Sequence, residues 1–210
     1  MAGPGSDRKE AILNTALTLF VTRGFYGTPT SLISKEAGVA TGTLFFYFKT
    51  KEELIDTLYL RIKAEAAAAM RRGLDDEQDT QGRLRRLWVN AVEWGIKNPA
   101  KMQFMEQFAH SPFVSTTAHE EGLSRFSFLH EYVLQGIREG VIRNSDPSLL
   151  FCMMASTLAS VIARVAEVDD PEVRRTIIEQ GMDFVWNGLR AEGVPREKKS
   201  RRSTRETVIP

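Results

Sequence analysis

The sequence predicts an all-α protein, with three short N-terminal helices, a long connecting helix and five larger C-terminal helices. Apolar residues recur at steps of three and four along the chain, the period of amphipathic helices, and no segment alternates convincingly at the two-residue period of a strand. Side chains that can cap helices stand directly before proline at Asn98, Asp146 and Asp170, which is typical of helix starts. No unit repeats at a solenoid period.

The N-terminal helices are predicted over about residues 7–23, 29–37 and 41–48. Asp7 and Glu10 have the three-residue spacing of a capping box, and Gly24 is expected to end the first helix. Thr28 is expected to cap the second helix, with Pro29 at its first position.

A long connecting helix is predicted over residues 51–72, beginning at a second capping box formed by Thr50 and Glu53. A polar linker, 75–79, separates it from the C-terminal helices, which are predicted over 80–97, 99–110, 117–139, 147–167 and 171–191. The expected domains are 7–50 for the N-terminal helices and 51–192 for the connecting helix and the larger helices, with a tail at 193–210.

Composition is that of an ordinary globular chain. There are 28 Lys and Arg against 27 Asp and Glu, a formal net charge of +1, so no overall field attracts acidic partners. No apolar run reaches the roughly 18–20 residues of a membrane span, and no export signal is visible. We therefore expect a cytoplasmic protein with no membrane partner. Residues 194–210 hold six Lys and Arg and two Asp and Glu, which predicts a basic, disordered tail.

Two short helices separated by residues 38–40 have the size and turn of a helix-turn-helix. On geometry alone, a generic helical hairpin explains the same pattern. The residues themselves are more specific, and those that matter are Gly24, Phe25, Thr28, Ile33, Ala37, Gly38, Val39, Gly42, Thr43, Leu44, Tyr47, Phe48, Lys51, Glu52, Glu53 and Leu54. In one uninterrupted register over about residues 8–55, they resemble the N-terminal domain of TetR-family (TetR/AcrR-type) transcriptional regulators.

The resemblance implies a homodimeric, ligand-responsive regulator that binds double-stranded DNA at an inverted-repeat operator. Such a protein is most often a repressor, and a small-molecule effector releases it from the DNA. The resemblance implies neither enzyme activity nor a cofactor.

The third helix would then be the recognition helix in the major groove. Its N-terminal residues Thr41, Gly42 and Thr43 are expected to approach base edges and phosphates. One of the two phenylalanines that follow is expected to pack in the small core with Leu44 and Phe48, leaving Phe46 for a thymine methyl or a sugar. The remaining expected phosphate contacts are Thr28, Tyr47 and Lys51. The recognition helix carries no basic residue, so phosphate neutralisation there is weak.

The C-terminal helices would form the ligand-binding and dimerisation domain. Tyr59 and Trp88, with the Trp94–Gly95 pair, resemble the RamR-type subgroup of multidrug-responsive regulators. The ligand residues that we expect are Tyr59, Trp88, Trp94, Phe104, Phe108 and Met154. An aromatic face of this kind suits small apolar or cationic aromatic molecules, although each residue alone is as well explained by a packed core.

The last two helices are expected to pair with their copies as a four-helix bundle, because small residues on one and an apolar stripe on the other permit close approach. The alternative is a helical metal-binding or protein-interaction module without an operator. Glu106 and His110 are four residues apart and could share a metal on one helical face, but no metal site is favoured. Cys152 is expected to be a small buried hydrophobe.

Overall fold

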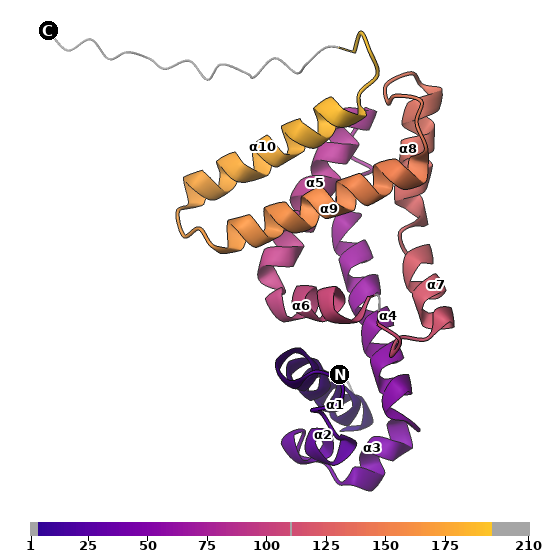
Figure 1. Cartoon of the computed structure of the whole chain (residues 1–210), viewed down its shortest axis with the longest axis vertical. Helices are drawn as coiled ribbons and strands as arrows, with labels where there is room; N and C mark the ends of the chain where they lie inside the picture. Colours follow the sequence, from indigo (N-terminus) through magenta and orange to yellow (C-terminus); the bar gives the residue numbers. More distant parts are fainter. Residues whose placement is uncertain (1–3, 110, 195–210) are drawn as a thin grey trace, which may run out of the picture.

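The computed structural model describes residues 4–109 and 111–194 of the chain. Over these residues the fold is all-α, as predicted, and one isolated antiparallel bridge joins Ile142 to Arg190. The helices are α1 (Pro4–Arg23), α2 (Thr30–Glu36), α3 (Thr41–Tyr47), α4 (Lys51–Met70), α5 (Thr80–Lys97), α6 (Pro99–Phe108), α7 (Thr116–Ser124), α8 (Ser127–Arg138), α9 (Pro147–Ala166) and α10 (Pro171–Leu189). Figure 1 shows α1–α3 at one end of the molecule and α9 and α10 at the other, with α4 running between them.

Helices α1, α2 and α3 close around a small apolar core. Ile12 and Phe20 of α1, Ile33 of α2 and Leu44 of α3 are fully buried there. Two predictions about helix starts are wrong in this region. Because α1 begins at Pro4, Asp7 lies inside the first turn and not at the cap. The N-cap of α2 is Pro29, which makes no side-chain cap hydrogen bond.

The start of α4 follows the predicted capping box. The Thr50 hydroxyl accepts a hydrogen bond from the Glu53 N–H at 3.0 Å, and Glu53 Oε2 accepts one from the Lys49 N–H at 2.7 Å. The first bond satisfies a donor that a helix start otherwise leaves open, and the second ties the residue before the cap to the same turn. They fix the direction in which α4 leaves the N-terminal helices.

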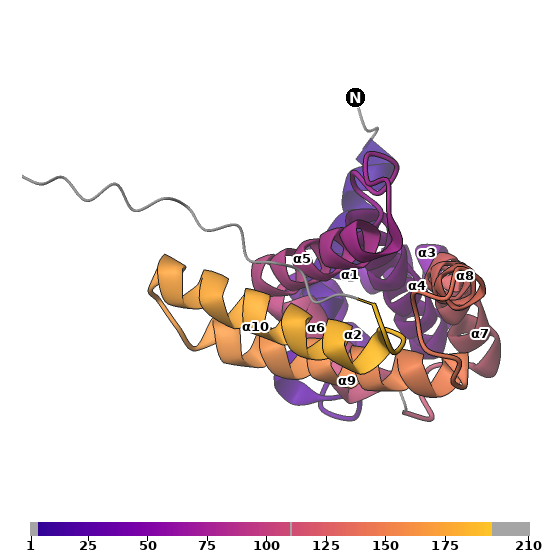
Figure 2. The same cartoon turned by 90° about the horizontal axis from the view of Figure 1, so that it is seen from above.

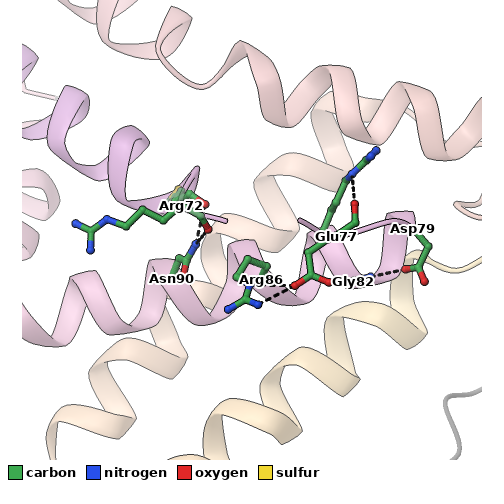
Figure 3. A network of polar contacts seen from close by, with 8 residues as sticks. Arg72, Glu77, Asp79, Gly82, Arg86 and Asn90 are labelled. Atoms are coloured by element: carbon green, nitrogen blue, oxygen red, sulfur yellow. Dashed lines mark hydrogen bonds and ion pairs between the residues drawn. The ribbon is translucent and has the colours of Figure 1, made fainter. Parts of the chain in front are cut away.

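The linker between α4 and α5 is held by polar contacts (Figure 3). The Asn90 amide donates to the carbonyl oxygens of Met70 and Arg72 at 3.1 and 2.8 Å, which satisfies the end of α4. The Arg86 guanidinium pairs with Glu77 at 2.9 Å, and Asp79 caps α5 by accepting from the Gly82 N–H at 2.6 Å. The linker that was predicted from its polarity is therefore an ordered corner.

The single helix predicted over residues 117–139 is two helices, α7 and α8. The chain breaks at Arg125 and Phe126 between them. The reason is a change of packing partner, because α7 packs against α4 whereas α8 packs against α9. Periodicity in the sequence is nearly continuous across a break of this kind and does not reveal it.

Helices α9 and α10 lie side by side along one flank of the molecule in both views (Figures 1 and 2). Each begins at its predicted aspartate cap, since Asp146 accepts from the Ser148 N–H at 3.0 Å and Asp170 accepts from the Glu172 N–H at 2.8 Å. Close packing is required at Gly181, where an added Cβ would lie 2.7 Å from Trp88 Cζ2.

The outer face of the α9–α10 pair is apolar and exposed. Leu149, Met153 and Phe184 are among its large exposed side chains, and the Met153 and Phe184 side chains are 61% and 71% accessible. Cys152 is also exposed, so the prediction that it is buried is wrong.

By length and composition α9 could cross a membrane, contrary to the expectation from the sequence, yet it packs against α5, α8 and α10.

Two apolar cores form, and they do not divide at the predicted domain boundary of residue 50. The lower core joins α1–α3 to the first half of α4 and also takes in Phe104 and Phe108 of α6. The upper core is built from α5, α8, α9 and α10 with the end of α4. Helices α4 and α6 therefore connect the two ends of the molecule through packed side chains.

Candidate DNA-reading helix and ligand cavity

The turn between α2 and α3 has the geometry of a helix-turn-helix. Gly38 adopts φ +67°, a left-handed conformation that glycine reaches without strain. Ser34 Oγ and Thr41 Oγ1 lie 3.0 Å apart, which is a hydrogen bond from α2 to the first residue of α3. Leu44 and Phe48 are buried beneath α3, so the opposite face of the helix points outward.

The predicted base-reading residues lie on that outward face. Thr41 and Gly42 are exposed, Thr43 is half-buried, and the Phe46 side chain is 73% accessible. Phe45 is exposed as well, so the expectation that one of the two phenylalanines packs in the core is wrong. The exposed end of α3 is therefore a surface of small hydroxyls, a glycine and two aromatic rings.

Lys51 is directed into the protein. Its Nζ donates to the carbonyl oxygen of Phe25 and lies 3.8 Å from the centre of the Phe25 ring. Burial lowers the pKa of the Lys51 ammonium, and the neighbouring Glu52 opposes this in part. In this conformation Lys51 holds the start of α4 to the end of α1. Its ammonium does not point outward, as the predicted contact with a phosphate would require.

Thr28, the second predicted phosphate contact that the structure contradicts, points into the protein. Its side chain is fully buried, and its hydroxyl donates to the carbonyl oxygens of Leu19 and Gly24, at 3.1 and 2.8 Å. A hydroxyl in this position is not accessible to a phosphate. Tyr47, by contrast, is the half-buried last residue of α3, with its ring edge-on to Phe46 at 5.2 Å.

An apolar cavity of about 290 Å³ lies inside the upper half of the molecule. It is bounded by α4, α5, α6, α9 and α10 and by the region where α7 meets α8. The side chains that line it are Ile62, Lys63, Ala66, Met70, Leu84, Leu87, Trp88, Ala91, Trp94, Met102, Met105, Leu123, Phe126, Leu129, Phe151, Met154, Ala155, Leu158, Ala159, Ile162, Met182 and Val185. A concave, mostly apolar site of this size is typical of a small-molecule pocket.

Three of the six predicted ligand residues, Trp88, Trp94 and Met154, line this cavity. Trp88 also has a structural role, because its Nε1–H donates to the carbonyl oxygen of Ile178 at 2.9 Å and so ties α5 to α10. The Trp88 ring is consequently fixed in place before any ligand arrives.

The other three predicted ligand residues do not line it. Phe104 and Phe108 stack on each other at 4.7 Å and face Phe20 of α1 at 6.4 and 5.8 Å. They are core residues that attach α6 to the N-terminal helices. Tyr59 is fully buried in the lower core, where it stacks on His119 at 6.1 Å; burial raises the pKa of its hydroxyl.

Lys63 lies one helical turn beyond Tyr59 and lines the cavity, although it was not predicted as a ligand residue. The available signal was a lysine within the apolar run of the connecting helix. No residue-level rule separates such a lysine from one that reaches solvent.

The metal alternative gains no support in the described residues. No group of three or more His, Cys, Asp or Glu side chains that could hold a metal ion occurs over residues 4–109 and 111–194. His110 lies outside the described residues. His119 is placed against Tyr59, with its Nδ1 at 3.4 Å from the tyrosine oxygen.

An exposed recognition helix at one end and an apolar cavity at the other define a class of protein, the helix-turn-helix regulator with its own effector domain. Comparison with known families agrees with this. Residues 12–58 match the family described as bacterial regulatory proteins, tetR family, and residues 80–190 match the tetracyclin repressor-like C-terminal domain. The chain belongs to the TetR family of transcriptional regulators, which are DNA-binding proteins and not enzymes.

Similar proteins extend over nearly the whole chain. A tetR family transcription regulator from Shewanella sp. PV-4 is 30% identical with a TM-score of 0.81, covering 88% of this chain and 98% of that one. The regulator YhgD of Bacillus subtilis is 24% identical over 88% of this chain and 98% of its own length. The transcriptional repressor KstR2 of Mycobacterium tuberculosis is 25% identical over 92% of this chain and 98% of its own length.

Proposed function

We propose that the protein is a homodimeric repressor that binds an inverted-repeat operator and is released when a small molecule fills the α4-lined cavity. The observation that carries the proposal is the course of α4. The helix begins at Lys51, beside the recognition helix, and its later residues Ile62, Ala66 and Met70 line the cavity. One rigid element thus belongs to both sites.

The exposed face of α9 and α10 supports the dimer. Large apolar patches on a monomer are uncommon and mark interaction surfaces. Ala155, Ser156, Ala159 and Ser160 are small and lie along α9, so a second copy can approach closely. A two-fold dimer built on this face would carry two recognition helices, which requires two half-sites on the DNA.

On the DNA side, we assign direct base and phosphate contacts to Thr41, Gly42, Thr43, Phe46 and Tyr47. The inward Lys51 and the buried Thr28 are better explained as residues that stabilise the packing of the N-terminal helices. The basic segment from residue 195 onward lies outside the described residues; we propose that its charge adds a salt-dependent component to DNA affinity. We propose that this DNA-binding dimer acts in the cytoplasm.

On the ligand side, the cavity lining favours a small apolar molecule, held by the rings of Trp88 and Trp94 and by adaptable methionines. Membership of the RamR-type multidrug-responsive subgroup remains a prediction. The two tryptophans support it, whereas Tyr59, which also carried that resemblance, lies in the core.

Contacts between the two ends supply a route for the ligand's effect. Met102 and Met105 on α6 line the cavity, while Phe104 and Phe108 on the same helix pack on α1. In the segment after α6, the Phe113 ring stacks on Phe25 at 3.9 Å. A shift of α4 or α6 would therefore be transmitted to helices α1–α3 through packed side chains.

The test is selection of DNA that binds the full chain from a random pool, followed by sizing of the complex. We expect an inverted repeat bound by two protomers. Recovery of sequences with no two-fold symmetry, or of one protomer per site, would contradict the proposal.

A further inference from the structure

One charged side chain, Lys63, lies on the otherwise apolar lining of the cavity. Every other lining residue in the described part of the chain is apolar. Lys63 projects from α4 between two aromatic rings, with its Nζ 5.4 Å from the centre of the Tyr59 ring and 5.2 Å from that of Phe126. The ring faces attract a cation, so they hold the ammonium at the cavity wall.

The Glu65 carboxylate on the same helix is engaged elsewhere. Glu65, two residues further along α4, pairs with Arg61 at 2.9 Å and with Lys101. Over residues 4–109 and 111–194, Lys63 has no hydrogen bond or ion pair with a carboxylate. Burial accordingly lowers the pKa of its ammonium, with no neighbouring charge to oppose it. A cation that is half-buried without an anion has lost part of its hydration, and an anion supplied by a ligand would offset that loss.

We propose that the cavity binds an apolar monocarboxylic acid, with its hydrocarbon part among the α5, α6 and α9 side chains and its carboxylate on Lys63 Nζ. This inference rests on the proposed function, since it names the ligand class of the same cavity. One ammonium matches one negative charge, whereas a ligand with several phosphates would need more cations than the described lining offers. A cationic ligand, which the aromatic residues alone would allow, would bring a second positive charge to Lys63.

The experiment compares three ten-carbon probes of different charge, decanoate, 1-decanol and decyltrimethylammonium, by titration calorimetry with the full chain at neutral pH. A charge-assisted hydrogen bond favours the acid over the alcohol by roughly 10- to 150-fold. We expect decanoate to bind the tightest and the ammonium compound the weakest.

Lys63→Met keeps the length of the side chain and removes its charge. We expect decanoate to lose its advantage in this variant, while the affinity for decanol changes less than about threefold. Lys97→Met is the matched control, because Lys97 is an exposed lysine near the end of α5 that does not line the cavity. This control should keep the wild-type ranking.

The outcomes separate this inference from the proposed function. If the wild type binds decanol as tightly as decanoate, or if Lys63→Met keeps the preference for the acid, the acid inference is overturned and the cavity remains a ligand site. If none of the three probes binds the wild type, the acid inference and the ligand role of the cavity both fail. Should Lys63→Met lose decanol as well, the wild-type ranking alone decides.

Discussion

Gly42, at the second position of α3, is not required by the packing of the protein itself. It is exposed, its φ is not positive, and a Cβ added there would meet no atom within 4 Å. Glycine costs a helix up to about 1 kcal/mol relative to alanine. The residue therefore weakens the helix without a compensating internal contact, which points to close approach of the DNA.

Gly42→Ala should leave the free energy of unfolding unchanged or raise it by up to about 1 kcal/mol, while weakening operator binding. Denaturant unfolding and fluorescence anisotropy with operator DNA measure the two quantities. A variant that binds the operator as tightly as the wild type would show that the DNA does not need this glycine.

For single residues, the sequence indicated which side chains matter better than it indicated what each one contacts. Thr28 matches a cap in its local pattern, yet its hydroxyl reaches Leu19, nine residues back, which only the tertiary fold determines. Trp88 and Trp94 line the cavity, whereas Tyr59, predicted as a ligand residue, is buried in the lower core. Lys63, four residues later on the same helix and not predicted, lines the cavity instead. Residues one helical turn apart on α4 thus lie in the core or at the cavity, and a resemblance to a family does not determine which.

Helix α4 is tied to its neighbours by a chain of ion pairs that runs from α1 to α6. Arg61 pairs with Glu10 of α1 at 2.6 Å and with Glu65 at 2.9 Å, and Glu65 also pairs with Lys101 of α6. Burial would raise the pKa of Glu65, but the hydrogen bonds from Lys101 and Arg61 outweigh it, so the pKa lies below its ordinary value.

A carboxylate with a depressed folded-state pKa stabilises the fold above its unfolded pKa, and this contribution is lost as the pH falls through the folded value. Glu65→Gln should therefore lower the free energy of unfolding by about 1 kcal/mol at pH 7, with the difference vanishing in acid. Denaturant unfolding of both proteins from pH 7 downward checks this. A difference that is the same at every pH would contradict the assignment.

The contact between Phe113 and Phe25 joins the segment after α6 to the end of α1, with the two rings nearly parallel at 4°. Phe113→Ala should leave cavity binding intact and reduce the ligand's effect on operator affinity, because one packed connection is removed. Calorimetry and anisotropy, each with and without the ligand, measure the two. A full ligand effect in the variant would exclude this contact from the route.

Element boundaries were predicted well at three helix starts that have a capping side chain. The caps predicted at Asp7 and Thr28 do not form, and a boundary that depends on packing was missed. Thr50, Asp146 and Asp170 cap α4, α9 and α10 as predicted. The break between α7 and α8 has no comparable signal, because it arises where the chain leaves α4 for α9.

For the whole molecule, the exposed apolar face of α9 and α10 is the surface on which we propose that two copies pair. Phe184→Glu should shift the protein toward monomer and weaken operator binding, because a charge would be buried in the interface. Phe184→Leu is the control that keeps an apolar side chain. Sedimentation equilibrium gives the association constant; a Glu variant as dimeric as the Leu variant would place the interface elsewhere.

The proposed regulation depends on one coupling, in which occupancy of the cavity lowers the affinity of α3 for DNA through α4 and α6. The most direct measurement is the operator Kd by fluorescence anisotropy, with and without decanoate at a concentration that calorimetry shows to be saturating. We expect decanoate to raise the operator Kd by roughly 5- to 150-fold, the usual range of allosteric coupling. An unchanged Kd with the cavity occupied would contradict it.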